Sequence, residues 1–176
     1  MRVFIALELP ESAVDMLCAL QDKLVESGIG GKQVPRPNLH ITLKFIGDCD
    51  KKTSDQICAV VKETLKTVTA PIVCLNGISA FVRTGGDIVY AQIGGDVKAL
   101  EDIKNKLSKA LTDINIPQDS QPFVPHITLA RKAKFGTRQA SASSEQFFCG
   151  SVVVYDSDIL VSPPTYKKLY IAPLSR

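Results

Sequence analysis

The sequence has few of the features that build metal sites, disulfide frameworks or membrane spans. Its five cysteines are scattered and include no C-x-x-C pair, which argues against a structural zinc site and favours a reducing, cytoplasmic compartment. No apolar stretch approaches the roughly 20 residues that a transmembrane helix needs. The apolar run at the start is interrupted at Glu8 and Pro10, too early for a signal peptide. Acidic clusters suited to magnesium are also missing, so we expect no metal and no cofactor.

Charge and length set broader limits. The 176 residues are 45% hydrophobic and 22% charged, which suits one domain, or two closely joined lobes, with a substantial core. The formal net charge of +3 permits binding to nucleic acid without demanding it, because most dedicated nucleic-acid-binding proteins carry a denser basic patch.

The chain has only two histidines, and both lie in copies of one tetrapeptide. His40-Ile41-Thr42-Leu43 and His126-Ile127-Thr128-Leu129 are identical. On a β-strand, residues two apart point to the same face, so each copy places an imidazole and a hydroxyl side by side while its Ile and Leu face a core. Two such faces brought together would surround a small anion with two proton carriers and two hydroxyl donors.

The two tetrapeptides occupy equivalent places in a repeat. A strand from Phe4, a helix and a proline-rich approach lead to His40, and a strand from Val89, a helix and a proline-rich approach lead to His126. The two separations are 36 and 37 residues. A strand–helix–strand unit used twice suggests two lobes related by a pseudo-two-fold axis, with the two His-x-Thr strands face to face. A further predicted helix, over residues 54–66, has no counterpart after the second motif.

Local signals predict the remaining elements. Pro10 ends the first strand and opens a helix, and Thr53 or Ser54 is expected to cap the next helix, as Asp96 caps the third. Proline biases its predecessor away from helix, so the approach to the first motif should be extended. The other expectations are a strand over 71–82 with an irregularity near 76–77, a mobile polar loop over 132–145, and closing strands over 147–160 and 166–171.

This arrangement suits acid–base chemistry at a phosphodiester. Histidine titrates near neutral pH, with an unperturbed pKa of about 6.5, and each proton transfer typically contributes about 10²–10⁴-fold. One histidine would take a proton from water, the other would protonate the departing oxygen, and threonines would hold the non-bridging oxygens. The residues leave open which histidine takes which role. The alternatives are buried structural histidines, or a zinc site for which two histidines fall short of the usual ligand set.

The sequence resembles the 2H phosphoesterases, named for two His-x-Thr/Ser-x motifs, and within them the RNA 2′,3′-cyclic phosphodiesterases once called 2′-5′ RNA ligases. The matching stretches are residues 4–10, 39–47 and 125–131. The resemblance implies an α+β fold of two pseudo-symmetric strand–helix–strand lobes, with antiparallel sheets lining a central cleft and helices outside. Residues 1–176 would then form a single domain of two intertwined lobes.

The resemblance also implies an enzyme, a metal-free hydrolase that opens a 2′,3′-cyclic phosphate at an RNA 3′ end to a 2′-phosphomonoester. His40 would protonate the leaving 3′ oxygen, and His126 would activate water. RNA 3′ ends, tRNA fragments among them, would be the partners of a monomeric protein. Two alternatives stay open. One is the same site chemistry in reverse, joining RNA ends through a 2′-5′ linkage, or acting on another cyclic phosphate; the other is an RNA-end binding module without turnover.

Three further positions are candidates for substrate binding. The resemblance gives Phe45 as an aromatic that lies against the terminal base, and Arg131 as a cation near the phosphate. Strict strand alternation places both on the face opposite the histidines unless a bulge re-aims them; otherwise they are a core phenylalanine and a solvated arginine. Lys44 shares the alternation of His40 and Thr42, so geometry predicts a phosphate contact, with an ordinary surface lysine as the alternative.

Overall fold

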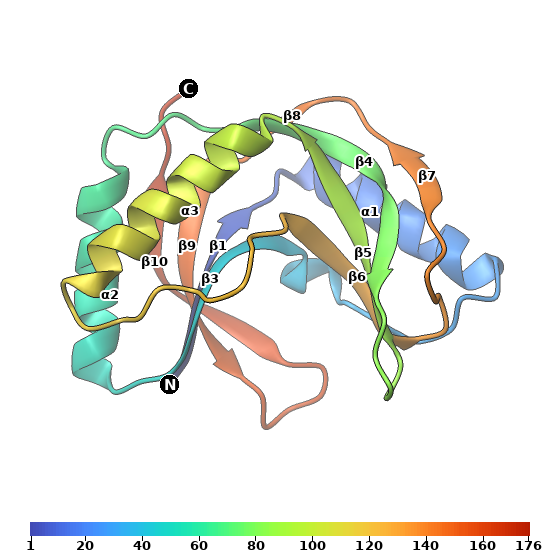
Figure 1. Cartoon of the computed structure of the whole chain (residues 1–176), viewed down its shortest axis with the longest axis horizontal. Helices are drawn as coiled ribbons and strands as arrows, with labels where there is room; N and C mark the ends of the chain where they lie inside the picture. The colour runs from blue at the N-terminus through green and yellow to red at the C-terminus, as the bar shows by residue number, and fades with distance from the viewer.

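Two antiparallel sheets and three helices make up the computed structural model, which describes residues 1–176 (Figure 1). The first sheet, sheet A, has the strand order β10-β9-β1-β3. Its strands are β1 (Arg2–Glu8), β3 (His40–Asp48), β9 (Ser151–Asp158) and β10 (Thr165–Pro173).

The second sheet, sheet B, has the order β2-β6-β5-β4-β7, and β8 also pairs with β4. Its strands are β2 (Lys32–Gln33), β4 (Ile72–Phe81), β5 (Asp87–Gly95), β6 (His126–Ala133), β7 (Ala140–Ser143) and β8 (Phe147–Phe148). The α+β class with two antiparallel sheets, predicted from the sequence, is confirmed.

Strand β1 is buried on both faces, unlike a half-solvated antiparallel strand. Val3, Ile5 and Leu7 belong to the main hydrophobic core. Phe4 and Ala6 point the other way and pack with aromatic and aliphatic side chains of β9 in a second, smaller cluster. Sheet A therefore has one face on the main core and one aromatic face, and the aromatic face carries His40.

Helices α1 (Glu11–Glu26) and α3 (Val97–Thr112) each pack against the sheet that does not contain the preceding strand. Helix α1 follows β1 of sheet A but packs on β6 of sheet B, whereas α3 follows β5 of sheet B but packs on β3 of sheet A. Buried Gln21 fastens the first of these contacts, since its Nε2 donates 2.8 Å hydrogen bonds to the carbonyls of Val34 and Leu129. The predicted repeat therefore consists of β1-α1-β3 and β5-α3-β6. Because the helix of each unit packs against the sheet of the other unit, we propose that residues 1–176 form one domain of two intertwined lobes.

Helix α2 (Lys51–Leu65) packs against α3, β9 and β10 and lies outside this repeat. Asp50 caps it, accepting a 2.7 Å hydrogen bond from the amide of Thr53. The predicted cap at Thr53 or Ser54 is therefore wrong: both residues lie in the first turn of a helix that an acidic residue begins earlier. Asp96 caps α3 as predicted, through the amide of Ala99. None of the three helices has the length and hydropathy that a transmembrane span requires.

Three segments differ from the predicted elements, and one agrees. Residues Arg36–Asn38 form a 3₁₀ turn instead of an extended approach; the fixed φ of proline, roughly −65°, is compatible with either conformation. The polar stretch 132–145 contains β7, which pairs with β4, so only part of it is loop. The strand expected over 147–160 is interrupted at 149–150. The irregularity in β4 is present, with Gly77 at φ +105° beside a register shift.

Candidate active site

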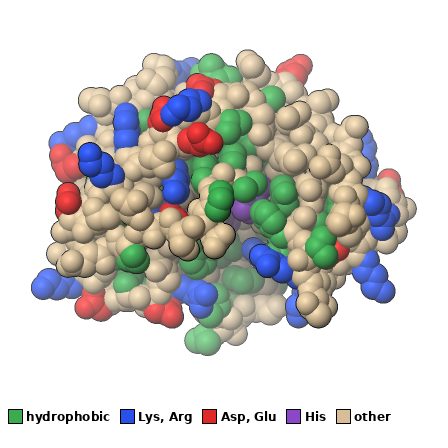
Figure 2. All heavy atoms as spheres, viewed as in Figure 1, with side chains coloured by type: hydrophobic (Ala, Val, Ile, Leu, Met, Phe, Trp, Pro, Cys, Tyr) green, Lys and Arg blue, Asp and Glu red, His purple; other side chains and the backbone are tan.

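The two histidine-bearing strands lie next to each other where the sheets meet. Strand β3 is the edge strand of sheet A, and β6 runs beside it from sheet B without strand pairing between them (Figure 1). Figure 2 shows a histidine at the bottom of a hollow in this face of the molecule, with hydrophobic and basic side chains around it. The fold thus brings His40 and His126, 86 residues apart in the chain, into one site.

Both imidazoles are held in the same way by the backbone. Nδ1 of His40 lies 2.7 Å from the carbonyl oxygen of Asn38, and Nδ1 of His126 lies 2.7 Å from the carbonyl oxygen of Val124. A carbonyl oxygen only accepts hydrogen bonds, so Nδ1 carries the proton in each ring. Each histidine therefore has Nε2 as the nitrogen that can exchange protons with a ligand.

The threonines stand beside the histidines, but the two motifs are not identical in their bonding. Oγ1 of Thr42 lies 3.0 Å from Nε2 of His40. With the proton on Nδ1, a neutral His40 accepts at Nε2, so the hydroxyl donates. Thr128 holds the corresponding place two residues after His126, without a hydrogen bond to the ring. The second imidazole thus keeps its Nε2 open.

Burial shifts the titration of both histidines downward. Loss of hydration, together with the nearby charges of His126 and Arg131, lowers the pKa of His40 to about 4, against the opposing hydrogen bond to Asn38. Burial likewise lowers the pKa of His126, with Arg131 acting in the same direction. Both rings are therefore neutral at neutral pH when no anion is bound, and a bound anion would raise both pKa values.

Aromatic rings surround both imidazoles and account for their burial. The ring centroid of Phe4 lies 5.1 Å from that of His40, and Tyr166 of β10 meets His40 edge-on at 5.6 Å. Local sequence patterns give no sign of Tyr166, since only the strand order places β10 near this site. The rings that meet His126 edge-on are Phe81 and Tyr90.

Each motif strand carries a bulge directly after its His-x-Thr. In β3, Thr42 pairs with Ala6 but Lys44 pairs with Ile5, so Leu43 is an extra residue. In β6 the corresponding extra residue is Leu129, between the pairs Tyr90–Thr128 and Val89–Ala130. An extra residue reverses the alternation of side chains beyond it. Strict alternation therefore fails at the same point in both motifs.

The reversal decides where the three predicted substrate-binding residues lie. Phe45 is 54% exposed and stacks on Phe4 at 5.8 Å, so it shares the face of His40. Arg131 is exposed and follows the bulge in β6, so it turns to the face of His126. Its charge acts to lower the pKa values of His40 and His126.

Lys44 turns away from this face, and the prediction that it shares the face of His40 and Thr42 is wrong. It is 3% exposed, and its Nζ donates to the Pro117 carbonyl at 2.9 Å and to Asp119 Oδ1 at 3.1 Å. The bulge sends the lysine inward, where it fastens the loop that precedes His126.

Side chains that could hold a metal are not gathered here: the structure contains no group of three or more His, Cys, Asp or Glu residues in ligating proximity. What the site offers an anion is two imidazole Nε2 atoms, two threonine hydroxyls and the Arg131 guanidinium. These groups can move protons and stabilise negative charge on oxygen.

Known proteins resemble this chain in sequence. A profile of the 2′-5′ RNA ligase superfamily matches residues 15–144. An RNA 2′,3′-cyclic phosphodiesterase of Aeropyrum pernix is 32% identical over 121 residues, which cover 67% of this chain and 66% of that protein. One of Thermotoga maritima is 25% identical over 181 residues, covering 97% of this chain and 94% of that protein.

A solved structure has the same architecture over nearly the full length. The crystal structure of TT0787 of Thermus thermophilus superposes with a TM-score of 0.85 at 25% identity, covering 99% of this chain and 98% of that one. The profile spans most of the chain and includes both His-x-Thr motifs. The chain therefore belongs to the 2′-5′ RNA ligase superfamily.

Proposed function

We propose that the protein is a metal-free hydrolase that opens the 2′,3′-cyclic phosphate of an RNA 3′ end to a 2′-phosphomonoester. The observation that carries this proposal is the pair of imidazoles whose Nδ1 atoms are bound to backbone carbonyls, so that both present Nε2 at one site. The names of the relatives from Aeropyrum and Thermotoga support the substrate class. Because both motifs come from one chain, we also propose that a monomer suffices.

The proposed step is an in-line displacement at phosphorus. Nε2 of His126 takes a proton from water as the water oxygen bonds to phosphorus. The bond from phosphorus to the 3′ oxygen breaks, and Nε2–H of His40 gives its proton to that oxygen. The products are a 2′-phosphate and a free 3′ hydroxyl. His126 suits the role of general base, because its Nε2 has no hydrogen-bond partner and the base must start neutral. His40 suits the role of general acid, because a ring with a low pKa is a strong acid when it is protonated.

The other residues would manage charge and position. The hydroxyls of Thr42 and Thr128 would donate to the non-bridging phosphate oxygens, and Arg131 would balance the negative charge. The anion would favour protonated His40, because it opposes the desolvation that lowers the pKa of that ring. Phe45, exposed and stacked on Phe4, would offer its ring to the terminal base.

The test uses a short oligoribonucleotide with a 2′,3′-cyclic phosphate, incubated with the protein in EDTA. We expect the mass to rise by one water and the phosphate to remain on the 2′ oxygen. A 3′-phosphate product, or turnover that requires an added metal ion, would contradict the mechanism. Saturable binding without turnover would instead indicate an RNA-end binding module. Longer products with 2′-5′ linkages, formed from 5′-hydroxyl partners, would indicate the reverse reaction.

A further inference from the structure

A second groove lies on sheet B, beyond the candidate active site. It lies between the β4–β5 turn and the segment that follows β6, and it has a volume of about 610 Å³. We call it the hairpin groove; its lining comes from residues 83–87 and 133–138.

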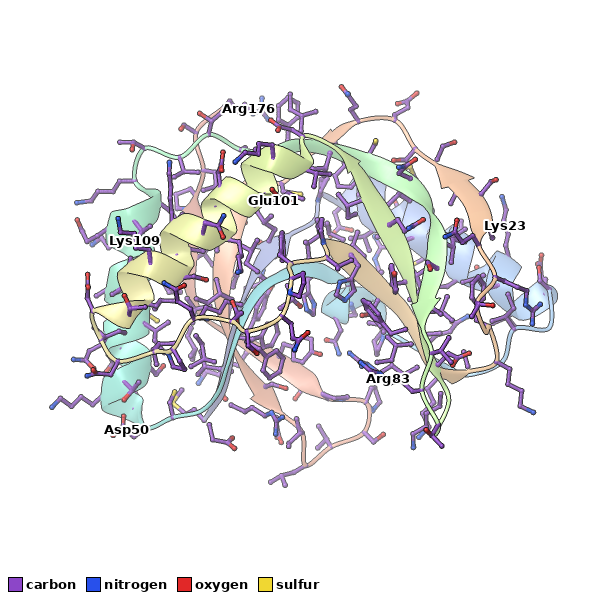
Figure 3. All side chains as sticks on the ribbon, in the orientation of Figure 1. Lys23, Asp50, Arg83, Glu101, Lys109 and Arg176 are labelled. Atoms are coloured by element: carbon purple, nitrogen blue, oxygen red, sulfur yellow. The ribbon has the colours of Figure 1, made fainter.

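Both walls of the hairpin groove begin at residues of the site. On one wall, Arg83 follows two residues after Phe81, whose ring packs on His126. Figure 3 shows Arg83 next to the β4–β5 hairpin. On the other wall, Ala133 follows two residues after Arg131 on β6. His126 pairs with Gln92 and Ala133 with Asp87, five positions apart on β5, or about 17 Å at roughly 3.3 Å per residue, so the groove lies beyond the two histidines.

The hairpin groove is rich in cations that have no carboxylate partner. Arg83, Lys134 and Arg138 line it, and exposed Lys132 adjoins it. None of these four forms an ion pair, whereas seven other basic residues of the chain do. Unpaired, exposed cations arranged along a groove are the electrostatic pattern that attracts a polyanion.

Asp87 is the one acidic residue in the lining, and backbone amides donate hydrogen bonds to its carboxylate. Oxygens of Asp87 accept hydrogen bonds from the amides of Arg83, Phe135 and Gly136, at 3.1, 3.0 and 2.7 Å. These bonds lower the pKa of Asp87, led by the one from Gly136. Asp87 thus ties the two walls together from the inside, and its carboxylate does not neutralise the exposed arginines and lysines. The side chain of Arg138 is held in the groove by a hydrogen bond, since its Nε donates to the Phe135 carbonyl at 2.9 Å.

From this geometry we infer that the hairpin groove binds the sugar–phosphate backbone of the nucleotides that precede the RNA 3′ end. The inference rests on the proposed function in taking an RNA end as the ligand, but it does not require turnover. The contacts are to phosphates, so they add affinity and salt dependence without base preference. They would make the site select RNA ends over mononucleotides.

The test measures binding of a 5′-fluorescein hexaribonucleotide that ends in a 3′-phosphate, which leaves no cyclic ester to hydrolyse. The groove variant is the triple substitution Arg83→Gln, Lys134→Gln and Arg138→Gln. The matched control removes three exposed, unpaired lysines on α2 and α3, through Lys62→Gln, Lys106→Gln and Lys109→Gln. Figure 3 shows Lys109 on α3, away from the β4–β5 hairpin. Both variants change the net charge equally, so a difference between them reports on position.

The groove variant should bind the hexanucleotide at least tenfold more weakly than the control variant. The slope of log affinity against log salt should fall by about 2, at roughly 0.7 per lost phosphate contact on a single strand. The preference for the hexanucleotide over adenosine 3′-phosphate should shrink by a similar factor. Equal losses in the two variants, an unchanged salt slope, or no binding of the hexanucleotide by the wild-type protein would overturn the inference. Loss of RNA affinity in the groove variant would uphold it even if no cyclic phosphate is hydrolysed.

Discussion

Phe45 and Arg131 occupy the same position in the two halves of the site. Each lies five residues after its histidine, and each follows a bulge that reverses the alternation of its strand, at Leu43 in β3 and Leu129 in β6. One half thus presents an aromatic ring and the other a guanidinium at equivalent points. The pseudo-symmetric backbone therefore carries an asymmetric pair, suited to a ligand that has a base on one side and negative charge on the other.

Replacing Arg131 by Gln should raise the pKa values of both histidines, because the guanidinium charge lowers them in the wild type. The chain has only two histidines, so NMR titration of their ring protons follows each directly. Loss of a charge-assisted hydrogen bond should also weaken binding of a cyclic-phosphate RNA by about tenfold. Lys23→Gln, which removes an equal charge on α1, is the control. Identical titration curves in the two variants would contradict the placement of Arg131.

Burial of His40 should make the protein less stable in mild acid. Its folded-state pKa, about 4, lies below the unfolded value of about 6.5. The unfolded chain therefore binds the proton more readily, so the contribution is fully present above pH 6.5 and is lost as the pH falls toward 4. The loss for this residue is up to about 3 kcal/mol. Urea unfolding across this range should show a shallower pH dependence in His40→Gln than in the wild type, and parallel curves would refute the assignment.

Because Lys44 is buried and pairs with Asp119, we expect the stability of the fold to depend strongly on that carboxylate. Asp119→Ala should lower the free energy of unfolding by about 3 kcal/mol, because it leaves a buried ammonium without its carboxylate. The exposed pair of Glu63 and Lys66 is the comparison, and Glu63→Ala should lower the free energy of unfolding far less, because solvent screens an exposed ion pair. Urea denaturation of both variants decides the matter. Similar losses would mean that Lys44 is not held in the way the structure shows.

The β4–β5 turn offers a matched pair of glycines for a test of the backbone. Gly86 has φ +106°, and a Cβ there would lie 2.6 Å from the Cα of Lys132, whereas a Cβ on Gly85 would meet nothing within 4 Å. Gly86→Ala should therefore destabilise the protein by about 1–3 kcal/mol, and Gly85→Ala should change stability by less than about 0.5 kcal/mol. Thermal unfolding of the two variants measures the difference, and equal melting temperatures would contradict the turn geometry.

The sequence alone predicts the parts of this molecule that depend on repetition and periodicity. The identical tetrapeptides and the strand–helix–strand repeat, with separations of 36 and 37 residues, indicate the pseudo-symmetric fold and the meeting of His40 with His126. The sequence does not predict the strand register, because a single extra residue reverses the faces of the side chains beyond it without any signature in the composition. Lys44 and Phe45 exchange faces for that reason.

The remaining differences also come from long-range structure. The rings around the histidines come from strands β1, β4, β5 and β10, and sheet order rather than local pattern brings them there. Tyr166 reaches His40 from the far end of the chain. The placement of α1 on sheet B and of α3 on sheet A depends on long-range packing, whereas the sequence predicts only that a helix follows each strand.

The most direct test of the central claim compares the wild type with His40→Ala, His126→Ala and the double variant on one cyclic-phosphate oligoribonucleotide. We expect each single substitution to lower kcat/KM by about 10²–10⁴-fold. The double variant should be little worse than the poorer single one, because residues that act as a unit are not additive. Circular dichroism spectra matching the wild type would show that the fold is intact. A well-folded single variant that keeps more than about a tenth of the wild-type rate would contradict a mechanism in which the two histidines act as one acid–base pair.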